Sequence, residues 1–157
     1  MNNSDNVQIV PFDDKYAEDF KRWNLEWIEK YFVVEGNDRK HLNHPRENII
    51  NQGGEIYSVI ENGKVMGVCA LVYYGEGIYE IAKMAVEKDA RGKGYGNLLI
   101  EAAIDGAKEK GATKIIIVSN TILEPAIKLY KKYKFKTTRL GQDPNYERGN
   151  IKMELIL

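Results

Sequence analysis

The residues best suited to bind a ligand stand in the segment "DARGKGYG", where glycine occurs at every second position. Its candidate ligand-binding residues are Arg91, Gly92, Lys93, Gly94 and Gly96. Glycines let an anion approach the main chain, and a helix that begins here offers N–H groups without helical partners. Arg91 and Lys93 add positive charge that suits a diphosphate. The segment therefore predicts a phosphate-binding loop, against the alternative of a solvated glycine-rich turn.

Two common phosphate-binding motifs do not fit this loop. A P-loop requires Gly-Lys followed by Ser or Thr at a fixed offset from its first glycine, and neither Gly92 nor Gly94 meets this requirement. A dinucleotide fingerprint that starts at Gly92 requires glycine where Asn97 stands. The following strand also ends in Ser119-Asn120 instead of a ribose-binding acid. Because variant fingerprints exist, a dinucleotide-binding protein stays a third hypothesis.

The first third of the chain predicts a strand in "VQIVPF" and then a helix capped by Asp13 or Asp14. Five aromatic residues recur along this helix at steps of three or four, and we expect them to form its buried face: Tyr16, Phe20, Trp23, Trp27 and Tyr31. A ligand-stacking role is the alternative. The segment "VVEGNDRKHLNHPRENIINQGG" mixes loop signals with a short helix after His44-Pro45.

The rest of the chain predicts a mixed sheet. Glu55 to Val86 is typical of three antiparallel strands, with turns at Asn62-Gly63 and Gly75–Gly77. A helix that stops at Gly111 follows the glycine loop, and then come a buried strand "TKIIIVS", a helix near Glu124-Pro125 and the strands "KTTRL" and "IKMELIL". Strand, loop, helix and strand form a right-handed crossover whose two strands are parallel. We therefore expect an α/β (α+β) fold.

The composition is that of one ordinary globular domain, residues 1–157, with 43% hydrophobic and 29% charged residues. A formal net charge of +0 argues against a nucleic-acid partner, which needs a basic face. The segment "MNNSDNVQIV" lacks the pattern of a signal peptide, and no apolar run approaches the roughly 20 residues that span a bilayer. We expect a cytoplasmic protein without a membrane partner. Cys69, the only cysteine, lies in "GVCALVYY" and is expected to be buried and inert.

One further motif fits the loop. It has Arg or Gln, then Gly three positions later, then Gly or Ala two positions after that, and here these residues are Arg91, Gly94 and Gly96. Together with "EIAKMAVEKDARGKGYGNLLI", "AIKLYKKYKF" and the order of elements, the chain resembles the GNAT (GCN5-related) N-acetyltransferase superfamily over nearly its whole length. The resemblance implies a largely antiparallel sheet with a parallel pair splayed at an acetyl-CoA cleft and helices on both faces. It also implies transfer of an acetyl group from acetyl-CoA to a primary amine, on a small molecule or a peptide or protein, by direct attack in a ternary complex.

The resemblance implies which residues contact acetyl-CoA. A β-bulge would splay the strand that ends at Val86, whose main chain would pair with the pantetheine arm and offer an N–H to the thioester oxygen. The loop would hold the pyrophosphate, and the Asn120 side chain would bond the pantetheine, unless it only shapes a turn. The implied cofactor-binding residues are Met84, Ala85, Val86, Arg91, Gly92, Lys93, Gly94, Tyr95, Gly96, Asn120, Ala126 and Tyr130.

The resemblance also places two catalytic residues. Tyr130 matches the general acid that protonates the departing thiolate, with simple core packing as the alternative. Glu80 matches the glutamate that deprotonates the amine through water, with a solvated residue paired to a lysine as the alternative. Strand alternation would put Glu80, Ala82 and Met84 on one side, and Ile81, Lys83 and Ala85 on the other. Glu35 and Asp38 are second candidates for the base, or residues that shape the acceptor pocket.

The chain departs from the family at Lys134, where relatives commonly have glycine. A left-handed lysine costs roughly 1 kcal/mol relative to glycine, so a different helix end is expected. His41 and His44, with Asp38 and Glu47, do not have supporting ligand spacing elsewhere, and no metal is expected.

Three matters stay open. A non-catalytic acyl-CoA-binding module that keeps the loop but has lost the base is the alternative function. The acceptor, whose pocket would come from the early helices and the loop "GQDPNYERGN", is also open, as is a homodimer formed through the last strands.

Overall fold

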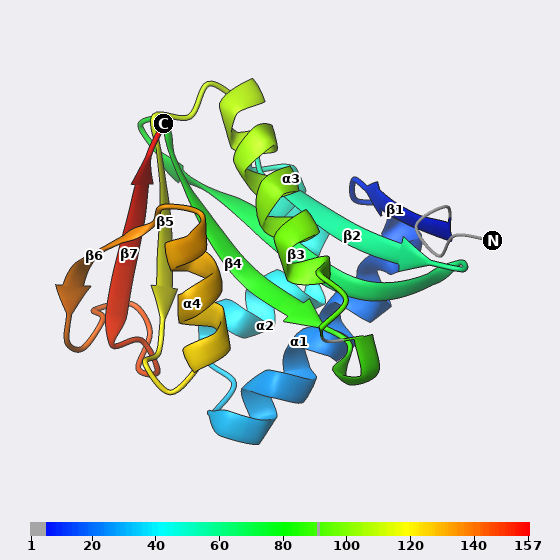
Figure 1. The fold of residues 1–157 in the computed structure, drawn as a ribbon, viewed down its shortest axis with the longest axis horizontal. Coiled ribbons are helices and arrows are strands. Elements are labelled where there is room, and N and C mark those ends of the chain that lie inside the picture. Colours follow the sequence, from blue (N-terminus) through cyan, green and yellow to red (C-terminus); the bar gives the residue numbers. More distant parts are fainter. Residues whose placement is uncertain (1–5, 91) are drawn as a thin grey trace.

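The computed structural model describes residues 6–90 and 92–157 and shows a mixed α/β fold with helices on both faces of one sheet (Figure 1). Its strands are β1 (Val7–Val10), β2 (Glu55–Glu61), β3 (Lys64–Gly75), β4 (Ile78–Val86), β5 (Lys114–Ser119), β6 (Lys136–Leu140) and β7 (Ile151–Ile156). Its helices are α1 (Ala17–Tyr31), α2 (Gly36–Asn43), α3 (Tyr95–Glu109) and α4 (Glu124–Lys132), with short helical turns η2 (Asp14–Tyr16), η3 (Arg46–Ile50) and η4 (Lys88–Ala90). None of the helices in these ranges is long and apolar enough to cross a membrane.

The sheet has the order β1-β2-β3-β4-β5-β7-β6. Among the strands of the described residues, β4 and β5 pair in parallel, and every other neighbouring pair is antiparallel. The predicted meander and the crossover through α3 are both confirmed. The crossover places the glycine loop and the start of α3 at the carboxyl end of β4, next to the parallel pair.

β4 carries a bulge, and beyond its first residues it separates from β5. Val68 of β3 faces Ala85 and Ala70 faces Ala82, so β4 holds one more residue than β3 between these pairs. Lys83 lies at this point with a φ of 53°. Pairing of β4 with β5 ends at Glu80, and Figure 1 shows the two strands close at their starts and apart at their ends. The predicted bulge and divergence are confirmed.

Two hydrophobic cores hold the helices to opposite faces of the sheet. Leu99 and Ile100 of α3 belong to one core, together with Ile127 and Tyr130 of α4. Helices α1 and α2 pack on the other face, where the buried residues include Phe20, Ile28, Leu42 and Ile49. Cys69 is fully buried, which raises its pKa to about 12, so the expectation of a buried thiol is confirmed.

The buried face of α1 differs from the predicted aromatic stripe. Its buried residues are Phe20, Asn24 and Ile28, whereas Trp23 and Trp27 are half-buried and Tyr31 is 49% exposed. Asn24 is tolerated inside because its amide donates to the Phe20 carbonyl at 2.9 Å and its oxygen accepts from Trp27 Nε1 at 3.1 Å. The periodicity correctly predicted a helix, but the prediction that all five aromatic residues are buried was wrong.

The segment that follows α1 contains two helical elements instead of one. The predicted short helix after Pro45 is present as η3. Helix α2 was missed because its N-cap is Glu35, which is not a usual capping residue. Glu35 and Asp38 nevertheless form a reciprocal capping box, in which the Glu35 N–H donates to Asp38 at 2.9 Å.

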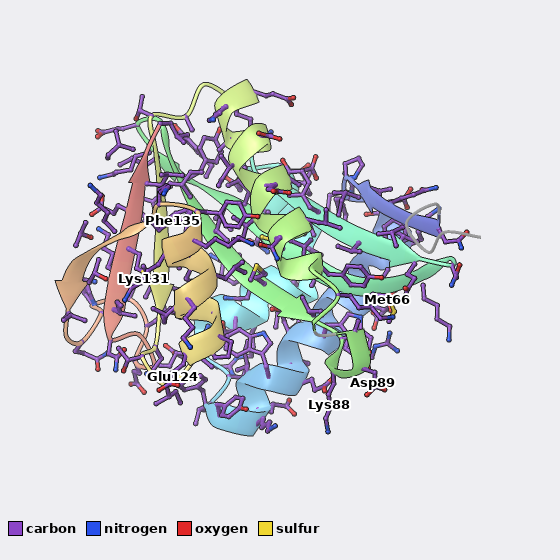
Figure 2. All side chains as sticks on the ribbon, in the orientation of Figure 1. Met66, Lys88, Asp89, Glu124, Lys131 and Phe135 are labelled. Carbon is purple, nitrogen blue, oxygen red and sulfur yellow. The ribbon has the colours of Figure 1, made fainter. Side chains whose placement is uncertain are left out.

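Helix α4 ends in the left-handed conformation even though Lys134 replaces glycine. Lys134 has a φ of 73°, its N–H donates to the Lys131 carbonyl at 3.0 Å, and the Phe135 N–H donates to the Tyr130 carbonyl at 3.1 Å. This is a Schellman motif, so the expected different helix end was wrong. Figure 2 shows Phe135 at the end of α4 opposite Glu124, and its buried ring packs 6.3 Å from that of Tyr130.

Replacing Lys134 by glycine should stabilise the fold by about 1 kcal/mol, because glycine removes the steric cost of the left-handed conformation. Glycine also raises the conformational entropy of the unfolded chain, but this opposing effect is smaller than the steric cost removed. Urea denaturation should show a higher midpoint with an unchanged slope. Lys131→Gly, at an exposed position of the last turn, is the matched control and should destabilise by about 1 kcal/mol. Destabilisation by both changes would contradict this account of the helix end.

Candidate active site

A cleft of about 300 Å³ opens where β4 and β5 diverge. Its walls come from α1, β4, β5, α4 and the loop that precedes β7. Four predicted site residues of β4 line it, together with one of α4: Glu80, Met84, Ala85, Val86 and Tyr130. Ala126 and Asn120 line it as well, so the fold brings most of the predicted residues to one cavity.

The bulge changes which residues of β4 share a face. Ala82 and Ala85 oppose Ala70 and Val68, which belong to the core against α1 and α2. Met84 and Val86 instead pack against the core below α3. The predicted alternation is therefore wrong beyond Ala82, because the extra residue shifts every later side chain to the other face.

The glycine loop has the main-chain geometry that an anion site needs. Gly92 and Gly94 have φ angles of 87° and 82°, which favour glycine, and Gly94 caps α3. Among the described residues, no backbone acceptor is found for the N–H groups of Gly96 and Asn97, as expected of a first helical turn. A Cβ at Gly96 would come within 3.1 Å of Leu129, so glycine also permits close contact with α4. Arg91 lies outside the described residues.

The two remaining loop side chains contact Glu61 at the end of β2. Tyr95 is buried, and its hydroxyl donates to Glu61 at 2.7 Å. Lys93 Nζ lies 3.3 Å from the same oxygen on a half-exposed side chain. The hydrogen bond from Tyr95 lowers the pKa of Glu61, and Lys93 adds to this effect. The Tyr95 side chain thus anchors the loop to the meander, and a cofactor contact by either residue stays a prediction.

Tyr130 both packs in the core and lines the cleft. It is 7% exposed, and its ring packs edge-on against Phe135. Burial raises the pKa of its hydroxyl far above the ordinary value of 10, so the proton stays on the oxygen at neutral pH. The two roles considered for Tyr130 are therefore compatible in this position.

Asn120 shapes the turn after β5. Its amide donates to the Arg148 carbonyl at 2.7 Å, and its oxygen accepts from the Ile122 N–H at 3.0 Å. Both ends of the side chain are engaged within the protein, which corresponds to the turn role. Its predicted bond to pantetheine stays a prediction.

Glu80 is a buried carboxyl group at the floor of the cleft. It is 7% exposed, and its pKa is raised to about 7, chiefly by burial. The charge of Asp143 adds to the increase, whereas Lys83, Arg148 and Lys152 oppose it. A carboxyl group with a pKa near 7 gains and loses a proton readily at neutral pH, which suits general-base chemistry.

A buried ion cluster stands beside Glu80. Asp38 lies 2.7 Å from Lys83 Nζ and forms a two-pronged pair with Arg148 at 2.5 and 2.6 Å. Glu35 also contacts Arg148, at 3.2 Å. Burial alone would raise the pKa of Asp38, but the Arg148 hydrogen bonds and the Lys83 charge hold it well below its usual range.

This cluster ties α2 and the loop before β7 to the bulge of β4. Asp38 is thus committed to two cations, and Glu35 to Arg148 and to the Glu147 N–H at 3.0 Å. Neither acid lines the cleft, but both contact Arg148, which does, so a role as base or in shaping the acceptor pocket stays a prediction. Arg148 was missed by sequence reasoning, because its partners lie more than 100 positions away.

Within residues 6–90 and 92–157, no group of three His, Cys, Asp or Glu side chains is placed to hold a metal ion. His41 is instead a half-buried histidine. Burial first, and then the charge of Lys83, lower its pKa to about 4. It is therefore neutral at physiological pH.

Comparisons with known proteins agree with this geometry. The model of the acetyltransferase (GNAT) family matches residues 10–135. An uncharacterized N-acetyltransferase of Chlorobaculum tepidum is 33% identical over 73 residues, which span 46% of this chain and about half (47%) of that protein.

Two solved structures share the fold across nearly their whole length. An acetyltransferase of the GNAT family from Staphylococcus aureus superposes with a TM-score of 0.86 at 20% identity, covering 96% of this chain and 99% of that one. The yncA structure from Salmonella typhimurium, which contains its cofactor acetyl-CoA, superposes with a TM-score of 0.79 at 20% identity. The match covers 97% of this chain and 94% of that one.

Proposed function

Because the chain belongs to the acetyltransferase (GNAT) family, we propose that it transfers the acetyl group of acetyl-CoA directly to a primary amine in a ternary complex. The observation that carries the proposal is the convergence of Glu80 and Tyr130, from different elements, on the cleft between β4 and β5. One residue is poised to take a proton, and the other holds one at neutral pH.

The residues present fit acetyl-CoA. The N–H groups at the start of α3 and the glycines before them suit its pyrophosphate. Beyond Glu80, β4 has lost its pairing with β5, so the main chain of Met84 and Val86 can pair with the pantetheine arm as an added strand would. The arm would then lead from the loop toward Tyr130.

The chemistry requires two proton movements. An alkyl ammonium has a pKa near 10.4, so it must lose a proton before its nitrogen can attack the thioester carbonyl. We assign that proton to Glu80, received through water. As the C–N bond forms and the C–S bond breaks, the sulfur leaves as a thiolate, and we assign its proton to the Tyr130 hydroxyl. Main-chain N–H groups near the bulge would stabilise the oxyanion.

The test combines calorimetry of coenzyme A binding with a thiol-release screen of acetyl-CoA against amino acids, polyamines, aminoglycosides and peptides. We expect binding of coenzyme A and acceptor-dependent thiol release. Binding without thiol release for every acceptor would favour the non-catalytic acyl-CoA-binding module instead. Stabilisation by NAD and not by coenzyme A would indicate a dinucleotide-binding protein.

A further inference from the structure

A second hollow, of about 190 Å³, adjoins the cleft. Glu80, Val118 and Tyr146 line both cavities, so Glu80 stands at their boundary. The other walls of the second hollow include residues of α2, β6, β7 and the loop between the last two strands. An acceptor whose amine lies at Glu80 can therefore extend into this hollow, away from the space assigned to the pantetheine arm.

Of the two cations that line the hollow, Arg139 has an ion-pair partner among the described residues and Lys152 has none. Arg139 pairs with Asp143 at 2.5 Å, and Asp143 also accepts from the Asn145 and Tyr146 N–H groups. Lys152 lines the same space and forms no ion pair within the part of the chain that the structure describes. The hollow thus presents a carboxyl group, Glu80, and the ammonium group of Lys152, which faces Glu80 without forming a close ion pair among the described residues.

The hollow also gathers buried polar atoms that lack a hydrogen bond within the described part of the chain. Three buried side-chain polar atoms lack a hydrogen bond among the described residues, and two of them, His41 Nδ1 and Arg139 Nε, belong to residues that line this space. Buried polar atoms are nearly always hydrogen-bonded, so these two atoms require partners from outside the chain, which a ligand with polar atoms can supply. Arg139 Nε is a donor and requires an acceptor atom.

We infer that this hollow binds the carboxylate of a free amino acid, whose amine lies at Glu80 as the acetyl acceptor. The inference rests on the proposed function and adds the substrate class. A zwitterion matches the two charges in sign, with its ammonium at Glu80 and its carboxylate at Lys152 and the free Arg139 donor. A polyamine would place a second ammonium beside these cations, and a peptide N-terminus lacks the adjacent carboxylate.

The experiment compares amino acids with their decarboxylated counterparts: leucine with isoamylamine, phenylalanine with phenethylamine and lysine with cadaverine. Thiol release from acetyl-CoA gives kcat/KM for each compound in the wild-type protein and in Lys152→Met. Because Lys152 also faces Glu80, the rate alone does not isolate the carboxylate contact. The ratio of kcat/KM between the two members of a pair isolates the carboxylate contact, since both members use the same base. Lys136→Met, an exposed lysine of the same sheet that lines neither cavity, is the control.

We expect the wild-type protein and Lys136→Met to prefer each amino acid at least about ten-fold, and Lys152→Met to lose about ten-fold of that preference, as for one charge-assisted hydrogen bond. Equal use of both members of each pair would overturn the inference while supporting the proposed function. If no acceptor is used, the proposed function fails, and calorimetry with amino acids in the presence of coenzyme A decides the subsite. Binding that depends on Lys152 would retain the carboxylate site, and absence of binding would remove it.

Discussion

Replacing Glu80 by glutamine is expected to lower kcat/KM about a hundred-fold, because glutamine keeps the shape of the side chain but cannot accept the amine proton. Burial raises the pKa of Glu80 to about 7, so the wild-type rate should increase with pH through about 7 as the carboxyl group ionises. The variant should lack this limb of the pH profile. Initial rates of thiol release between pH 5.5 and 9 measure both effects.

Glu29→Gln is the matched control, because Glu29 is an exposed acid of α1 outside the cleft. It should retain the wild-type rate and the wild-type pH profile. A Glu80→Gln variant with the same pH limb would show that another group titrates near 7, and near-normal rates would remove Glu80 from the role of base.

The same change has a predictable effect on stability. A carboxyl group whose pKa is raised from 4.5 to about 7 contributes stability that is fully present below 4.5 and lost as the pH rises through 7. Glutamine does not ionise, so the melting temperature of Glu80→Gln should exceed that of the wild type at pH 8 and approach it at pH 5. If Glu80→Gln is more stable but slower than the wild type, the ionised Glu80 carboxylate lowers the stability of the fold and is needed for activity.

Local patterns predicted the elements whose signals are local. The turns at Asn62-Gly63 and Gly75–Gly77, the crossover through α3 and the glycine loop lie where the sequence placed them. Helix α2 was missed because it depends on a capping box built from acidic residues. The successes depend on hydrogen bonds that close within a few residues, which spacing along the chain reports. The capping box of α2 is equally local, but glutamate is not a usual N-cap residue and gave no helix-start signal.

The polar parts of the site depend on pairs that are distant in sequence. Asp38 and Arg148 are 110 residues apart, and the Glu61 contact of Tyr95 joins the end of β2 to the start of α3. The alternation of β4 failed at the bulge around Lys83, whose side chain pairs with the buried Asp38 of another element. A single sequence shows charged residues, but only the fold shows which of them become buried together.

Tyr130→Phe should lower kcat about a hundred-fold and leave the KM for acetyl-CoA within about two-fold, because phenylalanine preserves the packing and removes only the proton donor. The ring contact with Phe135 and the helix end at Lys134 should both persist, so the urea midpoint should change little. Steady-state kinetics of thiol release, with acetyl-CoA varied at saturating acceptor, separate the two constants.

Tyr133→Phe controls for the loss of a hydroxyl from the same region of the chain. That hydroxyl bonds Asn97 and Glu101, at 3.0 and 3.1 Å, and Tyr133 is not among the residues that line the cleft. Its removal should cost about 1 kcal/mol of stability with kcat retained. Burial keeps the Tyr130 proton in place well above neutral pH. Ionisation of Tyr130 should therefore cause no decline of the wild-type rate below about pH 9. The pH profiles of the wild type and Tyr130→Phe should then not differ on this alkaline side. Equal kcat values for Tyr130→Phe and the wild type would reduce Tyr130 to a packing residue, and water would then have to protonate the thiolate.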